Sequence, residues 1–148
     1  MGRNMTISRS MVALLLISIA MVVSPAVNSL PTGVNYDQIS AGGCNCHAAA
    51  PNAAVMVTLD GLPEEYNMSE TYQVTISFTG GPSAEGNANL GGFNLWASGG
   101  EITPLDATVQ SNGPSEVTHT EAGNDYTSWS IEWIAPSHGR DVDFVVHV

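Results

Sequence analysis

The sequence predicts an all-β protein: a β-sandwich of about seven antiparallel strands, preceded by a signal peptide and an irregular N-terminal arm. Two observations predict the sandwich. Several segments alternate apolar and polar residues with a period of two, which is typical of strands with one face on a core and the other in water. Turns rich in glycine and proline separate these segments, and no stretch shows sustained helical periodicity.

Residues 1–29 have the parts of a secretory signal peptide. Arg3 and Arg9 give a basic start, residues 11–23 form a short apolar run, and small residues follow it. A membrane-spanning helix needs about 20 apolar residues, so we expect cleavage, with an uncleaved N-terminal anchor as the alternative. The rest of the chain is then extracellular or at the cell surface. It would meet the membrane only through an uncleaved anchor or through an anchor missing from this sequence.

The chain is strongly acidic, with 14 Asp and Glu against three Lys and Arg and a formal net charge of −11. Loss of Arg3 and Arg9 with the signal peptide would change −11 to −13 and leave Arg140 as the last strong base. Such a charge repels phosphate backbones and anionic lipids, so we expect neither nucleic acid nor an anionic membrane surface as a partner. An acidic surface also suits a salty habitat through solubility alone.

The exported part divides into two regions. Residues 30–53 form a polar arm that contains Gly42-Gly43-Cys44-Asn45-Cys46-His47, and residues 54–148 form the sandwich. The chain ends inside its last predicted strand, so we expect either that this strand closes the sandwich or that the sequence is a fragment. The predicted strands are Val55–Leu59, Tyr72–Phe78, Phe93–Ala97, Ser115–Thr120, Trp129–Trp133 and Val142–Val146.

The apolar phase of these strands predicts one core. Trp96 lies on the opposite phase from Phe93 and Leu95, so we expect it to be exposed. The expected core residues are Val57, Tyr72, Val74, Ile76, Phe93, Leu95, Trp129, Ile131, Trp133 and Phe144, with Phe78 joining them if its strand runs that far.

Three parts of the chain resemble the Reeler domain, an extracellular immunoglobulin-like β-sandwich. The first part, similar to the entry into the family's second strand, is Gly61-Leu62-Pro63-Glu64-Glu65-Tyr66 followed by Thr71-Tyr72-Gln73-Val74. The second, similar to its central strand, is Gly92-Phe93-Asn94-Leu95-Trp96-Ala97. The third, similar to its closing half, is Val117-Thr118-His119-Thr120 with Trp129 and Trp133-Ile134-Ala135-Pro136-Ser137-His138-Gly139. The resemblance covers most of the exported chain and implies an immunoglobulin-like sandwich.

The layout, with a Cys/His motif ahead of the sandwich, is also similar to the prokaryotic "choice-of-anchor V" surface proteins. Those proteins typically have Cys-x-x-Cys-His at this place, whereas Asn45 is the only spacer here. The resemblance implies a surface protein with a cytochrome-c-like element, and the one-residue spacer departs from that pattern.

Three chemistries fit Cys44-Asn45-Cys46-His47. Covalent haem c would use the two thiols for the haem vinyl groups and His47 for the iron. Copper or zinc would be bound by two thiolates, His47 and one further ligand. A disulfide between Cys44 and Cys46 needs no cofactor and suits an exported protein, and a strained ring of this size would be easily reduced.

Either cofactor would need a further ligand from elsewhere in the chain. His119 lies in the family-like Thr-His-Thr segment, so we expect His47 and His119 to be the metal ligands, with a backbone-bonded sandwich histidine as the alternative. His138 lies in a turn, and His147 lies on the opposite phase of its strand from Phe144. His119 is therefore the first choice as the distant ligand.

Two functions remain, since no hydrolase motif or phosphate-binding loop is present and an enzyme is not favoured. The first is an electron-transfer protein with haem or a metal at Cys44, Cys46, His47 and His119. The alternative is an extracellular interaction or adhesion module with an unknown protein or surface partner, in which a Cys44–Cys46 disulfide is structural and no cofactor binds. Because the arm has few apolar residues, we expect it to pack loosely without its cofactor or disulfide.

Overall fold

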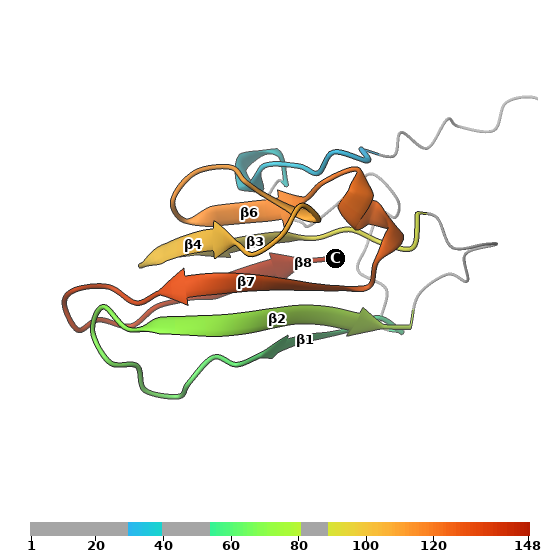
Figure 1. Cartoon of the computed structure of the whole chain (residues 1–148). Coiled ribbons are helices and arrows are strands. Elements are labelled where there is room, and N and C mark those ends of the chain that lie inside the picture. The colour runs from blue at the N-terminus through green and yellow to red at the C-terminus, as the bar shows by residue number, and fades with distance from the viewer. Residues whose placement is uncertain (1–29, 40–53, 81–88) are drawn as a thin grey trace, which may run out of the picture.

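The chain forms two packed four-stranded sheets in a computed structural model that describes residues 30–39, 54–80 and 89–148 (Figure 1). The predicted signal peptide and Cys44, Cys46 and His47 lie outside the described residues. The strands are β1 (Met56–Asp60), β2 (Thr71–Thr79), β3 (Asn94–Ala97), β4 (Glu101–Pro104), β5 (Val109–Ser111), β6 (Glu116–His119), β7 (Ser128–Ile134) and β8 (Phe144–His147). Two short 3-10 helices, η1 (Tyr36–Gln38) and η2 (Ala122–Asp125), complete the described elements.

The topology is that of an antiparallel β-sandwich, which confirms the predicted fold class. One sheet has the order β1-β2-β7-β4 and the other β5-β6-β3-β8. Each neighbouring pair in these sheets is antiparallel, so side chains alternate between a face turned to the other sheet and a face turned outward.

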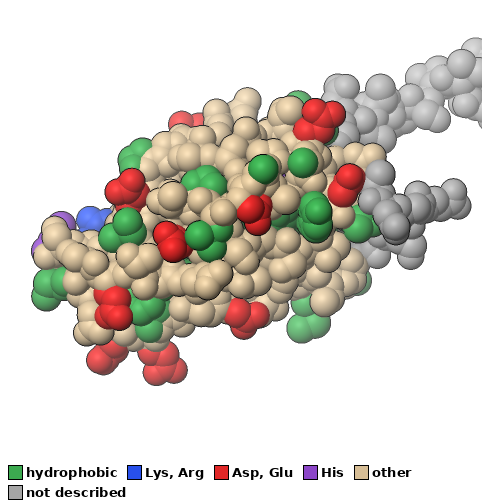
Figure 2. All heavy atoms as spheres, in the orientation of Figure 1, with side chains coloured by type: hydrophobic (Ala, Val, Ile, Leu, Met, Phe, Trp, Pro, Cys, Tyr) green, Lys and Arg blue, Asp and Glu red, His purple; other side chains and the backbone are tan. Residues whose placement is uncertain are grey.

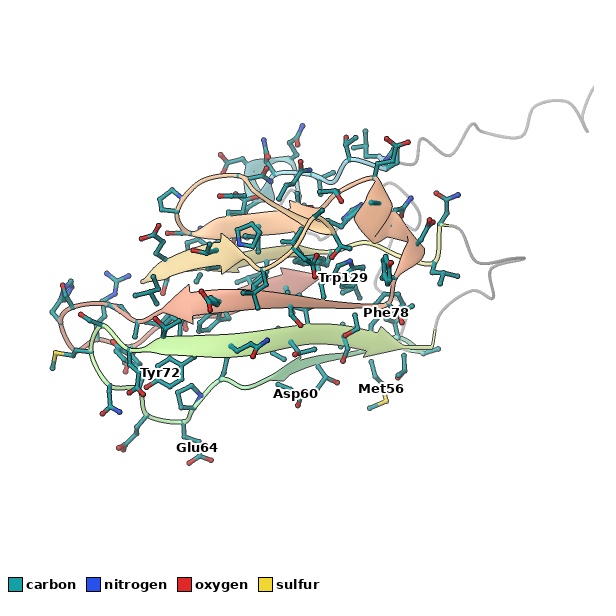
Figure 3. All side chains as sticks on the ribbon, in the orientation of Figure 1. Met56, Asp60, Glu64, Tyr72, Phe78 and Trp129 are labelled. Carbon is teal, nitrogen blue, oxygen red and sulfur yellow. The ribbon has the colours of Figure 1, made fainter. Side chains whose placement is uncertain are left out.

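The core lies between the two sheets where the alternating pattern placed it. The residues that the sequence assigned to one apolar face, Val74 and Ile76 on β2 and Trp129, Ile131 and Trp133 on β7, are all at most 2% exposed. In Figure 3, Phe78 and Trp129 lie close together at one end of the core, and their rings stack with centroids 6.2 Å apart. Tyr72, Phe78 and Phe144 are partly buried and pack against this core.

The described residues contain eight strands, which agrees with the prediction of about seven. β4 and β5 were not among the strands expected from the sequence, because they have only four and three residues and so show little alternation. One expectation about the core needs correction. Val57 was expected in the core but is 40% exposed. Its strand, β1, is at the edge of its sheet and pairs only with β2, so neighbouring strands cover Val57 from one side alone.

The described part of the arm packs on the outer face of the second sheet. The Tyr36 ring stacks on Trp96 with centroids 5.0 Å apart and an interplanar angle of 15°, so Trp96 is half-buried rather than exposed. The Asn94 side-chain amide donates to the Val34 carbonyl (2.7 Å), and the Tyr36 amide donates to the Glu116 carboxylate (2.6 Å). Residues 30–39 are thus held by the Tyr36–Trp96 stack, by the buried Ile39 and by polar contacts, and a count of apolar residues alone overlooked the polar contacts.

Acidic side chains are spread over the visible face of the sandwich, and a single blue patch marks a basic side chain (Figure 2). Arg140 is the sole Lys or Arg among the described residues. Within the same residues, no helix is long and apolar enough to cross a membrane.

Candidate functional site

His119 lies at one end of the sandwich, and strand register defines that end. At this end β2 finishes at Thr79, which pairs with the first residue of β1. At the same end β3 begins at Asn94, which pairs with the last residue of β8. His119 is the last residue of β6 at the same end. The described chain resumes just before β1, where the Ala54 carbonyl packs against Gly80. The chain therefore returns from residues 40–53 to the end of the sandwich that contains His119.

The His119 side chain belongs to the core phase of its strand. It lies two residues after the fully buried Val117 and opposite the buried Val109 of the neighbouring strand β5. The His119 side chain is itself 7% exposed. Its ring lies near Phe93, with centroids 6.4 Å apart. Burial at this position requires that the imidazole find a hydrogen-bonding partner, because an unpaired buried polar group costs about 1–3 kcal/mol.

The backbone of Phe93 provides that partner, as a donor or as an acceptor according to the tautomer of His119. The Nδ1 atom of His119 lies 3.0 Å from the Phe93 nitrogen and 3.1 Å from the Phe93 oxygen. In the Nε2–H tautomer, Nδ1 accepts a hydrogen bond from the Phe93 amide. In the Nδ1–H tautomer, Nδ1 donates to the Phe93 carbonyl and Nε2 keeps a free lone pair. The second form is the arrangement that a metal-ligating histidine commonly adopts.

Gly92 makes room for this ring. An alanine Cβ at position 92 would lie 2.3 Å from Cε1 and 2.6 Å from Nε2 of His119. In the sequence, Gly92 is identifiable only as part of a turn before a strand. Pairing of Asn94 with Thr118 brings residues 92 and 119 together, and the alternation within the two strands does not fix this register.

The other three residues of the predicted cofactor unit, Cys44, Cys46 and His47, lie outside the described residues, so their use together with His119 stays a prediction. Among residues 30–39, 54–80 and 89–148, no three His, Cys, Asp or Glu side chains are grouped closely enough to hold a metal ion. His138 is exposed in the turn after β7, at the opposite end of the molecule from His119.

A second polar pair occurs on the outer face of the second sheet. His147 on β8 lies opposite Asn94 on β3 in the strand register. The His147 Nδ1 and the Asn94 Oδ1 are both buried, and neither has a hydrogen-bond partner within the described chain. Burial lowers the pKa of His147 below its usual value of 6.5. The sequence placed His147 on this face but gave no sign of its burial.

Comparisons with known proteins gave matches among solved structures. No protein-family model matches the chain, and no curated protein matches it. Among solved structures, the chain is similar to the human F-spondin reeler domain in two crystal fragments. Fragment 1 is 24% identical with a TM-score of 0.45 over 63% of this chain and 73% of that one. Fragment 2 is 25% identical with a TM-score of 0.44 over 63% and 76%. The Reelin-N domain of F-spondin gives 25% identity and a TM-score of 0.44 over 63% and 70%.

Proposed function

We propose that this chain is an exported cell-surface β-sandwich protein with a redox element that binds haem c or a transition metal and transfers electrons. His119 is the observation that supports the proposal. It is a buried imidazole at the end of the sandwich, its Nδ1 faces the Phe93 backbone, and its Nε2 has no hydrogen bond to any described residue. Export follows from the signal-peptide sequence of residues 1–29.

The residues that would hold the group are Cys44, Cys46, His47 and His119. The two thiols suit thioether bonds to haem or thiolate bonds to copper or zinc, and the two imidazoles suit iron or either metal. His119 fits this role because the Phe93 carbonyl, 3.1 Å from Nδ1, can accept the Nδ1 proton and leave Nε2 as the ligand atom. When bound, haem iron or copper would supply one-electron chemistry.

Intact-mass analysis of the exported protein from its native source tests the proposal. A mass higher by one haem, with sharp visible absorption bands, supports thioether attachment, and a mass higher by one metal ion under native ionisation supports the metal form. His119→Ala should then change the visible spectrum or lower metal retention. His138→Ala, a substitution of an exposed histidine at the other end, should do neither. A mass lower by two hydrogens with no cofactor rejects the redox-cofactor proposal.

The alternative is an extracellular interaction module in which a Cys44–Cys46 disulfide is structural and no cofactor binds. One observation favours it: residues 30–39 are already held on the second sheet by the Tyr36–Trp96 stack and by hydrogen bonds from Asn94 and to Glu116. The arm therefore has contacts that position it without a cofactor. A partner would be a protein or another surface component rather than nucleic acid, given the net charge of −11.

A further inference from the structure

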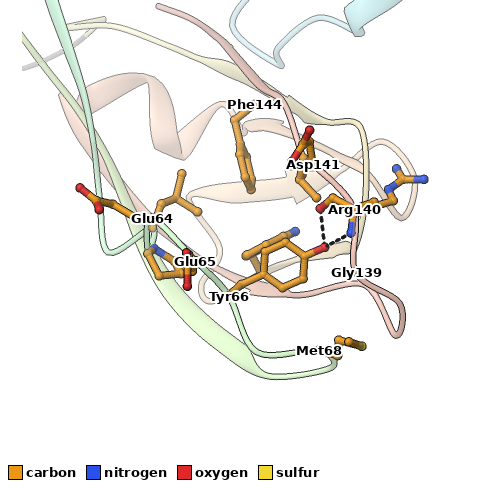
Figure 4. Close-up of a pocket in the computed structure, with 12 residues that line it drawn as sticks. Glu64, Glu65, Tyr66, Met68, Gly139, Arg140, Asp141 and Phe144 are labelled. Carbon is orange, nitrogen blue, oxygen red and sulfur yellow. Dashed lines mark hydrogen bonds between the residues drawn. The ribbon is translucent and has the colours of Figure 1, made fainter.

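A pocket of about 510 Å³ opens at the end of the sandwich opposite His119 (Figure 4). Two connections form it: residues 61–70 between β1 and β2, and residues 135–143 between β7 and β8. Trp133 near the end of β7 and Phe144 at the start of β8 also line it. This size falls in the range of about 300–1,000 Å³ that is typical of ligand sites.

Hydrogen bonds hold the two connections together. The Tyr66 hydroxyl donates to the Arg140 carbonyl (2.7 Å) and accepts from the Arg140 amide (3.1 Å). Nearby, the Ser69 amide donates to the Pro136 carbonyl (3.1 Å). These bonds join segments about 70 residues apart in the sequence, so the pocket is formed before any ligand arrives. A preformed site avoids part of the ordering cost of binding.

Three aromatic rings make one side of the pocket. Tyr66 and Phe144 each meet Trp133 edge-on, with centroids 5.4 Å and 5.1 Å apart. The Trp133 indole N–H donates to the Gly99 carbonyl (3.0 Å) and Trp133 is 1% exposed, so it supports the other two rings from behind. The half-buried Tyr66 and Phe144 present the ring surface that is open to the pocket. Aromatic faces attract cations, and apolar neighbours such as Leu62 and Val142 suit a methylene chain.

The charges around the pocket also favour a cation. Glu64, Glu65 and Asp141 line it, and none of them has a hydrogen bond or ion pair with another described residue. The Arg140 guanidinium packs instead on Gly99, in the turn between β3 and β4. Figure 4 shows it directed away from the rings of Tyr66 and Phe144. The lining therefore has three unpaired carboxylates, and its single cation is turned aside.

We propose that this pocket binds an arginine or lysine side chain from a basic segment of a partner protein. The cationic end would meet the carboxylates and aromatic faces, and its methylene stem would lie on the apolar lining. The net charge of −11 would attract such a segment over a longer range, and Met68, 61% exposed beside Gly139, adds apolar surface at the rim. The inference deepens the interaction-module alternative and does not depend on the cofactor.

Titration with a terminally blocked, arginine-rich pentapeptide tests the proposal, with its glutamine counterpart as control. The readout is the ¹H–¹⁵N spectrum of the exported chain at low ionic strength. We expect the arginine peptide alone to shift the Trp133 indole N–H and the Tyr66 and Arg140 amides. The Trp129 indole N–H, bonded to the Gly123 carbonyl at the other end, is an internal reference that should not move.

Matched double variants locate the effect. Glu65→Gln with Asp141→Asn should weaken peptide binding about fivefold, because each exposed ion pair contributes modestly. Asp37→Asn with Glu121→Gln makes the same change in net charge on exposed residues away from the pocket and should leave affinity within about twofold.

Three outcomes would overturn the proposal. They are equal weakening by both double variants, shifts centred on Trp129, and shifts from tetramethylammonium as large as those from the peptide at equal concentration. The first would indicate diffuse charge attraction, the second a site at the other end, and the third a site for small quaternary ammonium ions. A result that rejects the cofactor proposal would leave these peptide-binding measurements unchanged. Failure of the cofactor proposal and failure of the pocket proposal can therefore be told apart.

Discussion

Replacing Gly92 with alanine should displace the His119 ring and destabilise the fold. The added Cβ would lie 2.3 Å from Cε1, 2.6 Å from Nε2 and 2.7 Å from Nδ1. Ordinary contacts are about 3.5–4.0 Å, so the ring or the strand must move by about 1 Å. In the cofactor-free chain with the Nε2–H tautomer, the Phe93 amide donates to Nδ1, and a shift of that size breaks this 3.0 Å hydrogen bond.

Two effects of opposite sign set the magnitude. An unsatisfied buried amide at Phe93 costs about 1–3 kcal/mol. Gly92 is not among the glycines with positive φ, so alanine fits its backbone and stabilises by about 0.4–1 kcal/mol through the unfolded chain. We therefore expect Gly92→Ala to lower the free energy of unfolding by about 1–2 kcal/mol.

Urea unfolding followed by tryptophan fluorescence measures this loss. Gly139→Ala is the matched control, because its Cβ would meet only the Met68 methyl group at 3.8 Å. It should leave stability unchanged or raise it by up to about 1 kcal/mol. In a His119→Ala background, Gly92→Ala should cost much less, since the clash is gone. If Gly92→Ala matches the control, or costs the same with and without the imidazole, the assigned packing of His119 is wrong.

Two further predictions concern the outer face of the second sheet. Tyr36→Ala should uncover Trp96 and lower stability by about 1 kcal/mol through loss of the stacked pair; acrylamide quenching of tryptophan fluorescence should rise, and unchanged quenching would contradict the docking of the arm. His147→Gln should reduce the pH dependence of stability. Burial lowers the folded-state pKa of His147 below 6.5, so the unfolded state binds more protons between these two values. The contribution of His147 is then complete above 6.5 and declines as the pH falls toward the folded-state pKa. Urea titrations from about pH 8 to about pH 5 should show a smaller loss of stability in the variant, and parallel curves would refute this interpretation.

The fold was predictable because long alternating strands report burial directly. β2 and β7 have nine and seven residues, and their apolar phase matched the buried face. Short strands gave too little pattern, which is why β4 and β5 were missed. Val57 shows a second limit: alternation gives the side of a sheet on which a residue lies, while exposure also depends on whether its strand is at the edge.

The candidate site was only partly predictable for a related reason. Residue type singled out His119, but its environment depends on a partner 26 residues away, Phe93, and on a glycine that the sequence marked only as a turn. The register between β3 and β6 creates that environment. A period-two pattern excludes shifts by one residue but does not choose among shifts by two residues, because each of these preserves the pattern.

The pocket at the other end shows why core assignment and site assignment can coincide. Trp133 was expected in the core and is 1% exposed there, yet it also lines the pocket beside Tyr66 and Phe144. The two roles are compatible because a sandwich core ends where its sheets end, and the last core ring then borders the connecting loops. Tyr66 in the β1–β2 connection is hydrogen-bonded to Arg140 in the β7–β8 connection, and these two connections enclose the pocket above the last core ring. In this fold, therefore, a buried aromatic residue close to the end of a strand, such as Trp133 near the end of β7, is a site candidate as well as a core residue.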